Sequence, residues 1–171
     1  SDLFSGFGLW FASENHFVDN VKRLFEIRTL DGGPAWRQTT FHPFATTSRL
    51  ARGSALRLDV EAPVYATAAH GDAPLVAAAA SHDAASGAFA VFLQHRGLAE
   101  PVVVEIELPD AAAGAAVDAS GIWNADRFAV NTLEDPERVR PRPLATGMRG
   151  NALRLELPPI AWAAVRIGPA A

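Results

Sequence analysis

The sequence has no cysteine, one methionine, one tyrosine and a single lysine, Lys22. The missing cysteine excludes a disulfide scaffold, thiolate zinc sites and a cysteine nucleophile, and it fits the cytoplasmic location that we expect. No apolar run approaches the ~20 residues that a membrane span needs. The first residues lack the basic and apolar regions of a secretory signal. We therefore expect no contact with a membrane.

Positive charge is also scarce. The chain of 171 residues carries a net charge of −4, and nearly all of its 15 basic residues are arginines that form no basic face. Nucleic acid is therefore not an expected partner. With 49% hydrophobic and 20% charged residues, the composition is that of an ordinary globular domain rather than a disordered chain.

Composition changes at Gly32 and Gly33. The segment before them holds half of the phenylalanines and only one alanine, Ala12. Within it, residues 13–31 have apolar side chains at three- and four-residue steps, which predicts an amphipathic helix that the glycines would end. We therefore expect residues 1–33 to form an atypical helical appendage, either a helix that docks on the core or a sequence junction.

A second helix is predicted over residues 34–53. Pro34 suits the first turn of a helix, and Gly53 would close the segment. Pro43 should kink or end the helix, because proline removes a backbone donor. The partial apolar stripe of this helix consists of Trp36, Thr40, Phe41 and Phe44.

From residue 54 onward the apolar period changes to two, which is typical of half-buried strands. Residues 75–95 read as a hairpin around the turn cluster SHDAASG. The other predicted strands are ALRLDVE (55–61), PVVVEIEL (101–108), AVDASGIWN (116–124), ALRLELP (152–158) and AWAAVRIG (161–168). Many short strands without intervening helices predict a mainly β fold, a jelly-roll-like antiparallel β-sandwich over residues 54–171.

The chain offers little that resembles a catalytic or metal site. Most carboxylates alternate with apolar residues on the strands, where solvation is their usual role: Asp59, Glu61, Glu105, Glu107 and Glu156. The carboxylates of NTLEDPERVRPRP are interpreted as surface ion pairs of a loop. The histidines are too scattered for a helical zinc motif, and no phosphate-binding loop is present. We expect no catalytic residue, metal or cofactor, and packing roles for Trp36, Trp123 and Trp162.

Several stretches resemble one family. GGPAWRQTTFHPFATTSRLARGSALRL is similar to a segment of glycoside hydrolase family 51, the α-L-arabinofuranosidases. Further stretches resemble the C-terminal region of that family in the same order: HGDAPLVAAAASHD, FLQHRGLAEPVVVEIEL, NTLEDPERVRPRP and LPPIAWAAVRIG. The resemblance covers about residues 32–168, and the matching order makes it fairly specific.

This resemblance implies a C-terminal β-sandwich that follows a catalytic (β/α)8 barrel. Family members remove terminal α-L-arabinofuranosyl residues with retention, using two glutamates at the ends of barrel strands. Both glutamates lie upstream of the matching region, so none is assigned to this chain. Residues 34–53 resemble the last barrel helix. Residues 1–33 do not resemble the barrel strand that should precede it, so no substrate-binding residue is assigned.

The resulting hypothesis is a non-catalytic domain that packs on the catalytic barrel of an arabinofuranosidase acting on arabinan or arabinoxylan. The candidates for packing at the junction are Trp36, Arg37, Gln38, Phe41 and Phe44. Two alternatives stay open: a carbohydrate-binding module, suggested by the tryptophans, and one chain of a split glycosidase. A homo-oligomer is also an open alternative.

Overall fold

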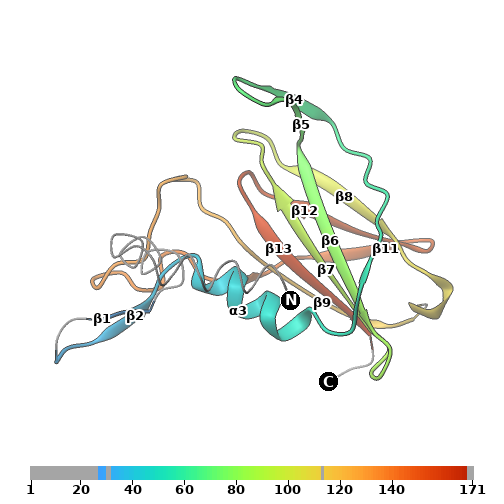
Figure 1. The fold of residues 1–171 in the computed structure, drawn as a ribbon, viewed down its shortest axis with the longest axis horizontal. Coiled ribbons are helices and arrows are strands. Elements are labelled where there is room, and N and C mark those ends of the chain that lie inside the picture. The colour runs from blue at the N-terminus through green and yellow to red at the C-terminus, as the bar shows by residue number, and fades with distance from the viewer. Residues whose placement is uncertain (1–26, 30–31, 113, 169–171) are drawn as a thin grey trace, which may run out of the picture.

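The computed structural model describes residues 27–29, 32–112 and 114–168, in which two antiparallel sheets face each other (Figure 1). The larger sheet has six strands in the order β10-β9-β13-β7-β6-β3, and the smaller has three in the order β11-β12-β8. The strands of the larger sheet are β3 (Ser54–Leu56), β6 (Val76–Asp83), β7 (Ala88–His95), β9 (Ala116–Ile122), β10 (Arg142–Pro143) and β13 (Trp162–Gly168). Those of the smaller are β8 (Val102–Glu107), β11 (Thr146–Arg149) and β12 (Ala152–Leu157).

The hydrophobic core lies between these two sheets. On β12 the leucines point inward and are almost fully buried, whereas Arg154 and Glu156 between them are exposed. The larger sheet supplies the opposite side of the core through alternate residues of β13. The central core residues are Leu93, Leu153, Leu155, Leu157, Ala163, Val165 and Ile167. The period-two alternation is thus the direct consequence of one buried face per strand.

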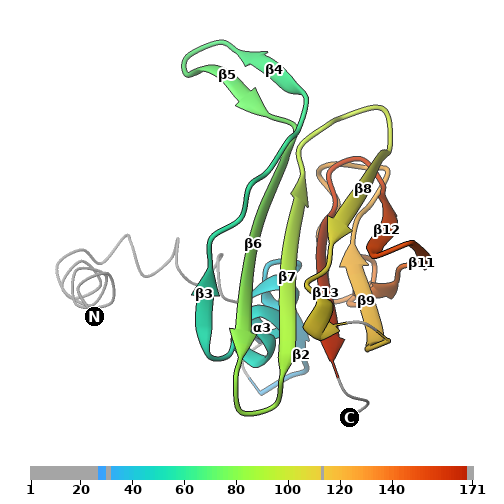
Figure 2. The same ribbon diagram turned by 90° about the vertical axis from the view of Figure 1, so that its right-hand side faces the viewer.

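Strand β13 differs because both of its faces are covered. It lies between β9 and β7, and the helix α3 (Phe41–Leu50) packs against it. Figures 1 and 2 place α3 and the smaller sheet on opposite sides of the larger sheet. Ala164, whose side chain points away from the core, is therefore only 2% exposed. Burial on both faces explains why AWAAVRIG reads as a nearly continuous apolar run.

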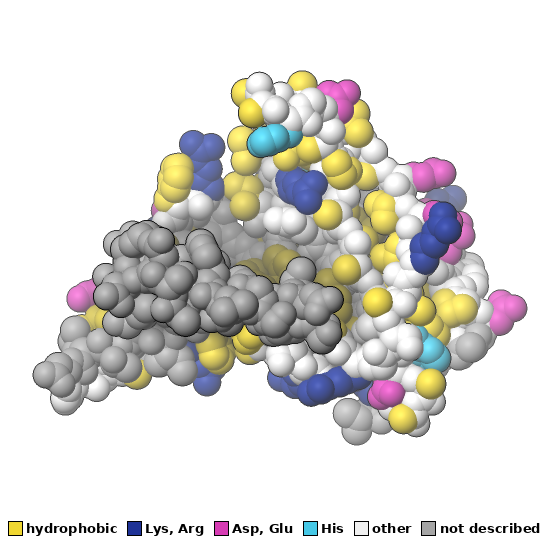
Figure 3. Space-filling model, viewed as in Figure 1, with side chains coloured by type: hydrophobic (Ala, Val, Ile, Leu, Met, Phe, Trp, Pro, Cys, Tyr) yellow, Lys and Arg dark blue, Asp and Glu magenta, His cyan; other side chains and the backbone are white. Residues whose placement is uncertain are grey.

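Three smaller elements lie outside the sandwich layers. Strands β4 (Val64–Thr67) and β5 (Gly71–Pro74) form a hairpin that projects from one end of the molecule, with apolar side chains visible at the top of Figure 3. Strands β1 (Ile27–Thr29) and β2 (Ala35–Arg37) form a second hairpin. A 3-10 turn, η1 (Asp110–Ala112), follows β8. None of the helices in the described ranges is long and apolar enough to cross a bilayer.

The structure confirms the antiparallel β-sandwich and most of its predicted strands. The hairpin over 75–95 and the strands of residues 101–108, 116–124, 152–158 and 161–168 are present as β6–β7, β8, β9, β12 and β13. The strand predicted over 55–61 is wrong beyond Leu56. The chain leaves β6 there, and Leu58 and Val60 are 37% and 47% exposed. Among the described residues, no strand pairs with this part of the chain, so the alternating side chains have no sheet on which to pack.

The helix predicted over residues 34–53 is shorter than expected. Pro34 precedes the strand β2, and the helix begins at Phe41. Pro43 is the third helical residue, where its missing N–H has no partner to lose, so it neither kinks nor ends the helix. The buried face carries His42 and Thr46 rather than the predicted rings, and Phe44 is 58% exposed.

The predicted helix of residues 13–31 lies mostly outside the described residues. Its end, Ile27–Thr29, is the strand β1, which pairs with β2 across a turn in which Gly32 has φ +64°. The two glycines therefore mark a hairpin turn, for which glycine is suited because it adopts positive φ without strain.

Replacing Leu157 by alanine should destabilise the fold by about 3 kcal/mol, because a fully buried leucine leaves a cavity. Urea denaturation measures the free energy of unfolding. The control is the same substitution at Leu98, which is 66% exposed and should cost less than about 0.5 kcal/mol. Equal losses for both variants would contradict the assigned core.

Candidate functional site

A buried asparagine connects the segment before α3 with the loop between β9 and β10. Asn131 lies in the loop of residues 123–141 between β9 and β10, and it is 2% exposed. Its Nδ2 donates hydrogen bonds to the backbone oxygens of Arg37, at 2.9 Å, and of Val139, at 3.0 Å. Its Oδ1 accepts a hydrogen bond of 2.8 Å from the backbone N–H of Val139. The carboxamide thus satisfies backbone groups on both sides of the contact.

The backbone oxygen of Asn131 is also used. It accepts hydrogen bonds from Trp36 Nε1, at 3.2 Å, and from Gln38 Nε2, at 3.1 Å. We call this set of residues the Asn131 clamp: Trp36, Arg37, Gln38, Asn131 and Val139. It fixes the segment that leads from β2 into α3 to the 123–141 loop of the sandwich. Because the partners are more than 90 residues apart in sequence, the contact is tertiary.

Rings and charges continue the clamp into the first turn of α3. The guanidinium carbon of Arg37 lies 5.1 Å from the centre of the Phe41 ring, within the range of a cation–π contact. The ring of Phe41 meets that of His42 edge-on at 5.8 Å. His42 is 7% exposed, and its Nε2 has no hydrogen-bond partner. Burial lowers the pKa of His42, with Glu137 opposing and Arg37 adding to this shift.

The structure therefore brings together Trp36, Arg37, Gln38 and Phe41 among the five predicted junction residues. Phe44 lies farther along α3, and its side chain is 58% exposed. The sequence did not point to Asn131 or Val139. Both lie in the stretch NTLEDPERVRPRP, which was interpreted as a loop with surface ion pairs. Arg138 of that stretch pairs at 2.9 Å with Asp126, a carboxylate that lies before it in the loop, and the buried positions of the stretch have no periodic pattern.

The tryptophans predicted to pack are half-buried and in contact with other side chains. Trp36 belongs to the clamp. The ring of Trp162 stacks with that of Phe92, with centres 6.2 Å apart, and the guanidinium of Arg142 lies over Trp123 at 5.2 Å. None of these three rings is classed as exposed. Trp10 lies outside the described residues.

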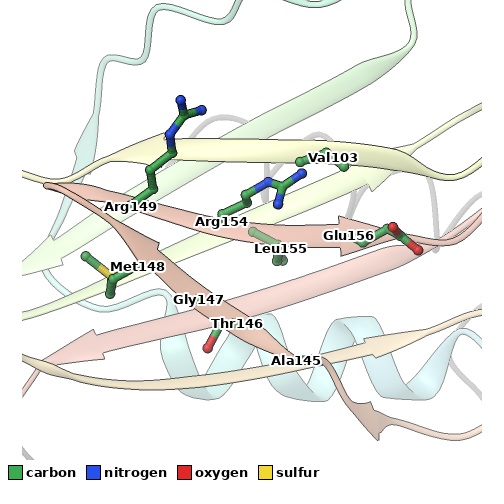
Figure 4. A pocket seen from close by; sticks show the side chains of 9 residues that line it. All are labelled: Val103, Ala145, Thr146, Gly147, Met148, Arg149, Arg154, Leu155 and Glu156. Carbon is green, nitrogen blue, oxygen red and sulfur yellow. The ribbon is translucent and has the colours of Figure 1, made fainter.

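A groove of about 470 Å³ lies on the smaller sheet (Figure 4). Its charged lining residues are Arg149, Arg154 and Glu156. Both arginines also approach Glu105, at 3.7 and 3.8 Å. Glycoside hydrolysis with paired carboxylates needs two such groups facing the substrate, but Glu156 is the only carboxylate in this lining.

A smaller groove of about 100 Å³ beside the end of α3 also holds one carboxylate, Asp83. Hydrogen bonds from the Ser86 hydroxyl, at 2.7 Å, and from the Ala85 N–H, at 3.1 Å, lower its pKa. Asp83 is therefore an ionised turn residue rather than a proton donor. In the described ranges no three His, Asp or Glu side chains lie together as a metal-binding group.

Fold and site together define a β-sandwich domain in which a polar cluster ties the segment before α3 to the 123–141 loop. The sequence pattern described as "Alpha-L-arabinofuranosidase C-terminal domain" matches residues 15–161. The chain belongs to this family. The match begins at residue 15, so the similarity to the family starts earlier in the chain than the predicted position, residue 32.

Individual relatives agree with this assignment. An intracellular exo-α-(1→5)-L-arabinofuranosidase of Streptomyces lividans is 38% identical over 147 residues, which are 85% of this chain and 22% of that protein. An exo-α-(1→6)-L-arabinofuranosidase of Bifidobacterium longum is 36% identical over 151 residues, which are 86% of this chain and 29% of that protein. A solved family 51 α-L-arabinofuranosidase from B. longum has a TM-score of 0.77 at 33% identity, covering 82% of this chain and 28% of its own. The chain thus spans about a quarter of these relatives.

Replacing Asn131 by alanine should destabilise the domain by about 3 kcal/mol, because it removes three hydrogen bonds to the backbone of Arg37 and Val139, two of them with the buried Val139. Asn124→Ala is the matched control, since the Asn124 side chain bonds only the exposed N–H of Asp126. Urea denaturation followed by tryptophan fluorescence compares the two. An Asn131→Ala loss no larger than that of Asn124→Ala would contradict the clamp.

Stability should also fall on mild acidification through His42. Because burial holds the pKa of His42 below its unfolded value, the unfolded chain binds the proton more readily. The contribution is therefore present above about pH 6.5 and is lost as pH falls toward the lowered folded pKa. His42→Phe should reduce the loss of unfolding free energy between pH 7.5 and 5.5. His70→Gln, in an exposed turn, should keep the wild-type pH dependence, and identical profiles for wild type and His42→Phe would refute the expectation.

Proposed function

We propose that this domain is non-catalytic and supports the (β/α)8 catalytic barrel of an α-L-arabinofuranosidase. The barrel would supply both catalytic glutamates and hydrolyse terminal α-L-arabinofuranosyl residues of arabinan or arabinoxylan. Two observations support this role. The chain spans 22–29% of the relatives, and neither groove in the described part holds a carboxylate pair.

The observation that carries the proposal is the Asn131 clamp. It ties the segment entering α3 to the sandwich through backbone oxygens and through the side chains of Trp36 and Gln38. By resemblance, this segment is where the chain passes from the barrel to the sandwich. Hydrogen bonds to buried backbone groups hold such a passage in one geometry, because breaking them leaves polar groups unpaired. The clamp therefore suits a domain that holds a barrel in place.

The finer proposals follow from the family. We assign residues 54–171 to the sandwich, residues 34–53 to the connection with the barrel and residues 1–33 to an appendage. Relatives are named exo-α-(1→5)- and exo-α-(1→6)-L-arabinofuranosidases, so no single linkage is proposed for the parent enzyme. Some relatives are named intracellular, which supports a cytoplasmic location.

The carbohydrate-binding alternative has less support. A binding platform needs exposed flat rings, whereas Trp36, Trp123 and Trp162 are half-buried and engaged with other groups. The split-glycosidase and homo-oligomer alternatives both rest on exposed apolar side chains such as Phe44, which fit attachment to the barrel of one enzyme equally well.

The purified 171-residue chain should not hydrolyse 4-nitrophenyl α-L-arabinofuranoside above the rate in buffer. The Streptomyces relative, assayed in parallel, is the positive control. Turnover by this chain that disappears in Glu156→Gln, the carboxylate of the larger groove, would refute the non-catalytic role.

A further inference from the structure

The 123–141 loop has no regular secondary structure, yet it is held by its own hydrogen bonds. Asn124 Oδ1 accepts from the N–H of Asp126, and Asp126 Oδ1 accepts from the N–H of Phe128, both at 2.9 Å. Asp126 Oδ2 pairs with Arg138 at 2.9 Å across the loop. Farther along, Thr132 and Asp135 are joined by mutual hydrogen bonds. With the Asn131 clamp, these contacts fix the shape of the loop before any partner binds.

This fixed loop holds apolar side chains in solvent. Phe128 is 74% exposed, and Val130 and Leu133 are 50% and 36% exposed. The guanidinium of Arg127 lies 4.7 Å from the centre of the Phe128 ring. Phenylalanine next to arginine is a combination enriched at protein interfaces. A single exposed ring is common, but several apolar side chains on one preformed loop are typical of a docking surface.

The position of the loop favours one occupant. In Figure 1 the loop, the β1–β2 hairpin and α3 lie together at one end of the molecule, away from the smaller sheet. This is the end at which the clamp holds the segment entering α3. In the relatives, 71–78% of the chain lies outside the matching region, and the family is a C-terminal domain. Under the proposed function, the barrel precedes this domain in the chain and therefore adjoins the segment entering α3.

We propose that the 123–141 loop is the element by which this domain docks on the catalytic barrel of the same enzyme, with Phe128 as its apolar anchor. This inference rests on the proposed function, since it names the surface through which the barrel is supported. Burying a large aromatic side chain in a partner's pocket is a common source of binding energy at an interface. The clamp then acts on both sides of the junction: it orients the connection, and it fixes the loop that presents Phe128.

The test joins residues 15–171 of this chain to the amino-terminal part of the Streptomyces lividans relative, in place of its matching segment. Hydrogen exchange of the 123–141 amides is measured in this chimera and in the isolated 171-residue chain. Docking should slow exchange in the chimera beyond its value in the isolated chain. Phe128→Ser should reduce that additional protection roughly 30-fold, as expected for loss of an interface anchor.

Leu98→Ser is the matched control, because Leu98 is 66% exposed in the connection between β7 and β8. It should leave the additional protection unchanged, and neither variant should alter the melting temperature of the isolated chain. Full protection in the Phe128→Ser chimera would overturn Phe128 as the anchor of the loop. No additional protection of the 123–141 amides in the chimera would overturn the docking role of the loop. So would a dimer of the isolated chain, seen by sedimentation, that Phe128→Ser converts to a monomer.

The same experiment separates this inference from the proposed function. An active chimera whose loop is protected equally with and without Phe128→Ser contradicts only the choice of Phe128 as the anchor, and an active chimera whose loop gains no protection contradicts the choice of the loop. If the relative keeps full activity and stability after its matching segment is deleted, the supporting role itself fails. An inactive wild-type chimera whose loop gains no protection counts against both.

Discussion

The carboxamide of Asn131 makes three hydrogen bonds to backbone groups of Arg37 and Val139, two of them with the buried Val139. An irregular loop cannot pair its own peptide groups as a helix or a sheet does, so each buried group needs a partner from elsewhere. Asn131 supplies both a donor and an acceptor in one side chain, and it bonds Arg37 and Val139. An ionised aspartate could only accept hydrogen bonds, and leucine could neither donate nor accept them. The shape of the 123–141 loop and the path of the chain into α3 both depend on this side chain.

The sandwich provides the rigid base for that contact. The leucines of β12 and the inward residues of β13 fill the space between the sheets. On its other face β13 supports α3, so the helix that continues from the clamp is packed directly on the central strand. A small residue at Ala164, 2% exposed, allows the strand to be covered on both faces. The hydrophobic core and the helix that follows the Asn131 clamp are therefore linked through β13.

The sequence predicted those parts of the fold in which one physical factor dominates. In β8 and β12, one face meets the core and the other meets water, so alternation identifies the strands. The prediction failed where position along the chain was decisive. Leu58 and Val60 alternate as a strand does, but no strand of the described residues pairs with them. Pro34 is compatible with a helix start, yet the residues after it pair with β1 instead. Asn131 gave no signal, because the groups that it satisfies lie far away in sequence.

Family resemblance contributed what periodicity could not, namely the proposal that the polar cluster before α3 lies at a connection between domains. The relatives add an argument about specificity. Enzymes named for (1→5) and for (1→6) linkages match this chain at 38% and 36% identity over nearly the same stretch. Two linkage preferences can therefore coexist with closely similar versions of this domain. Residues that distinguish the linkages are then expected in the part of the relatives that this chain does not cover, which agrees with the supporting role that we propose for the domain.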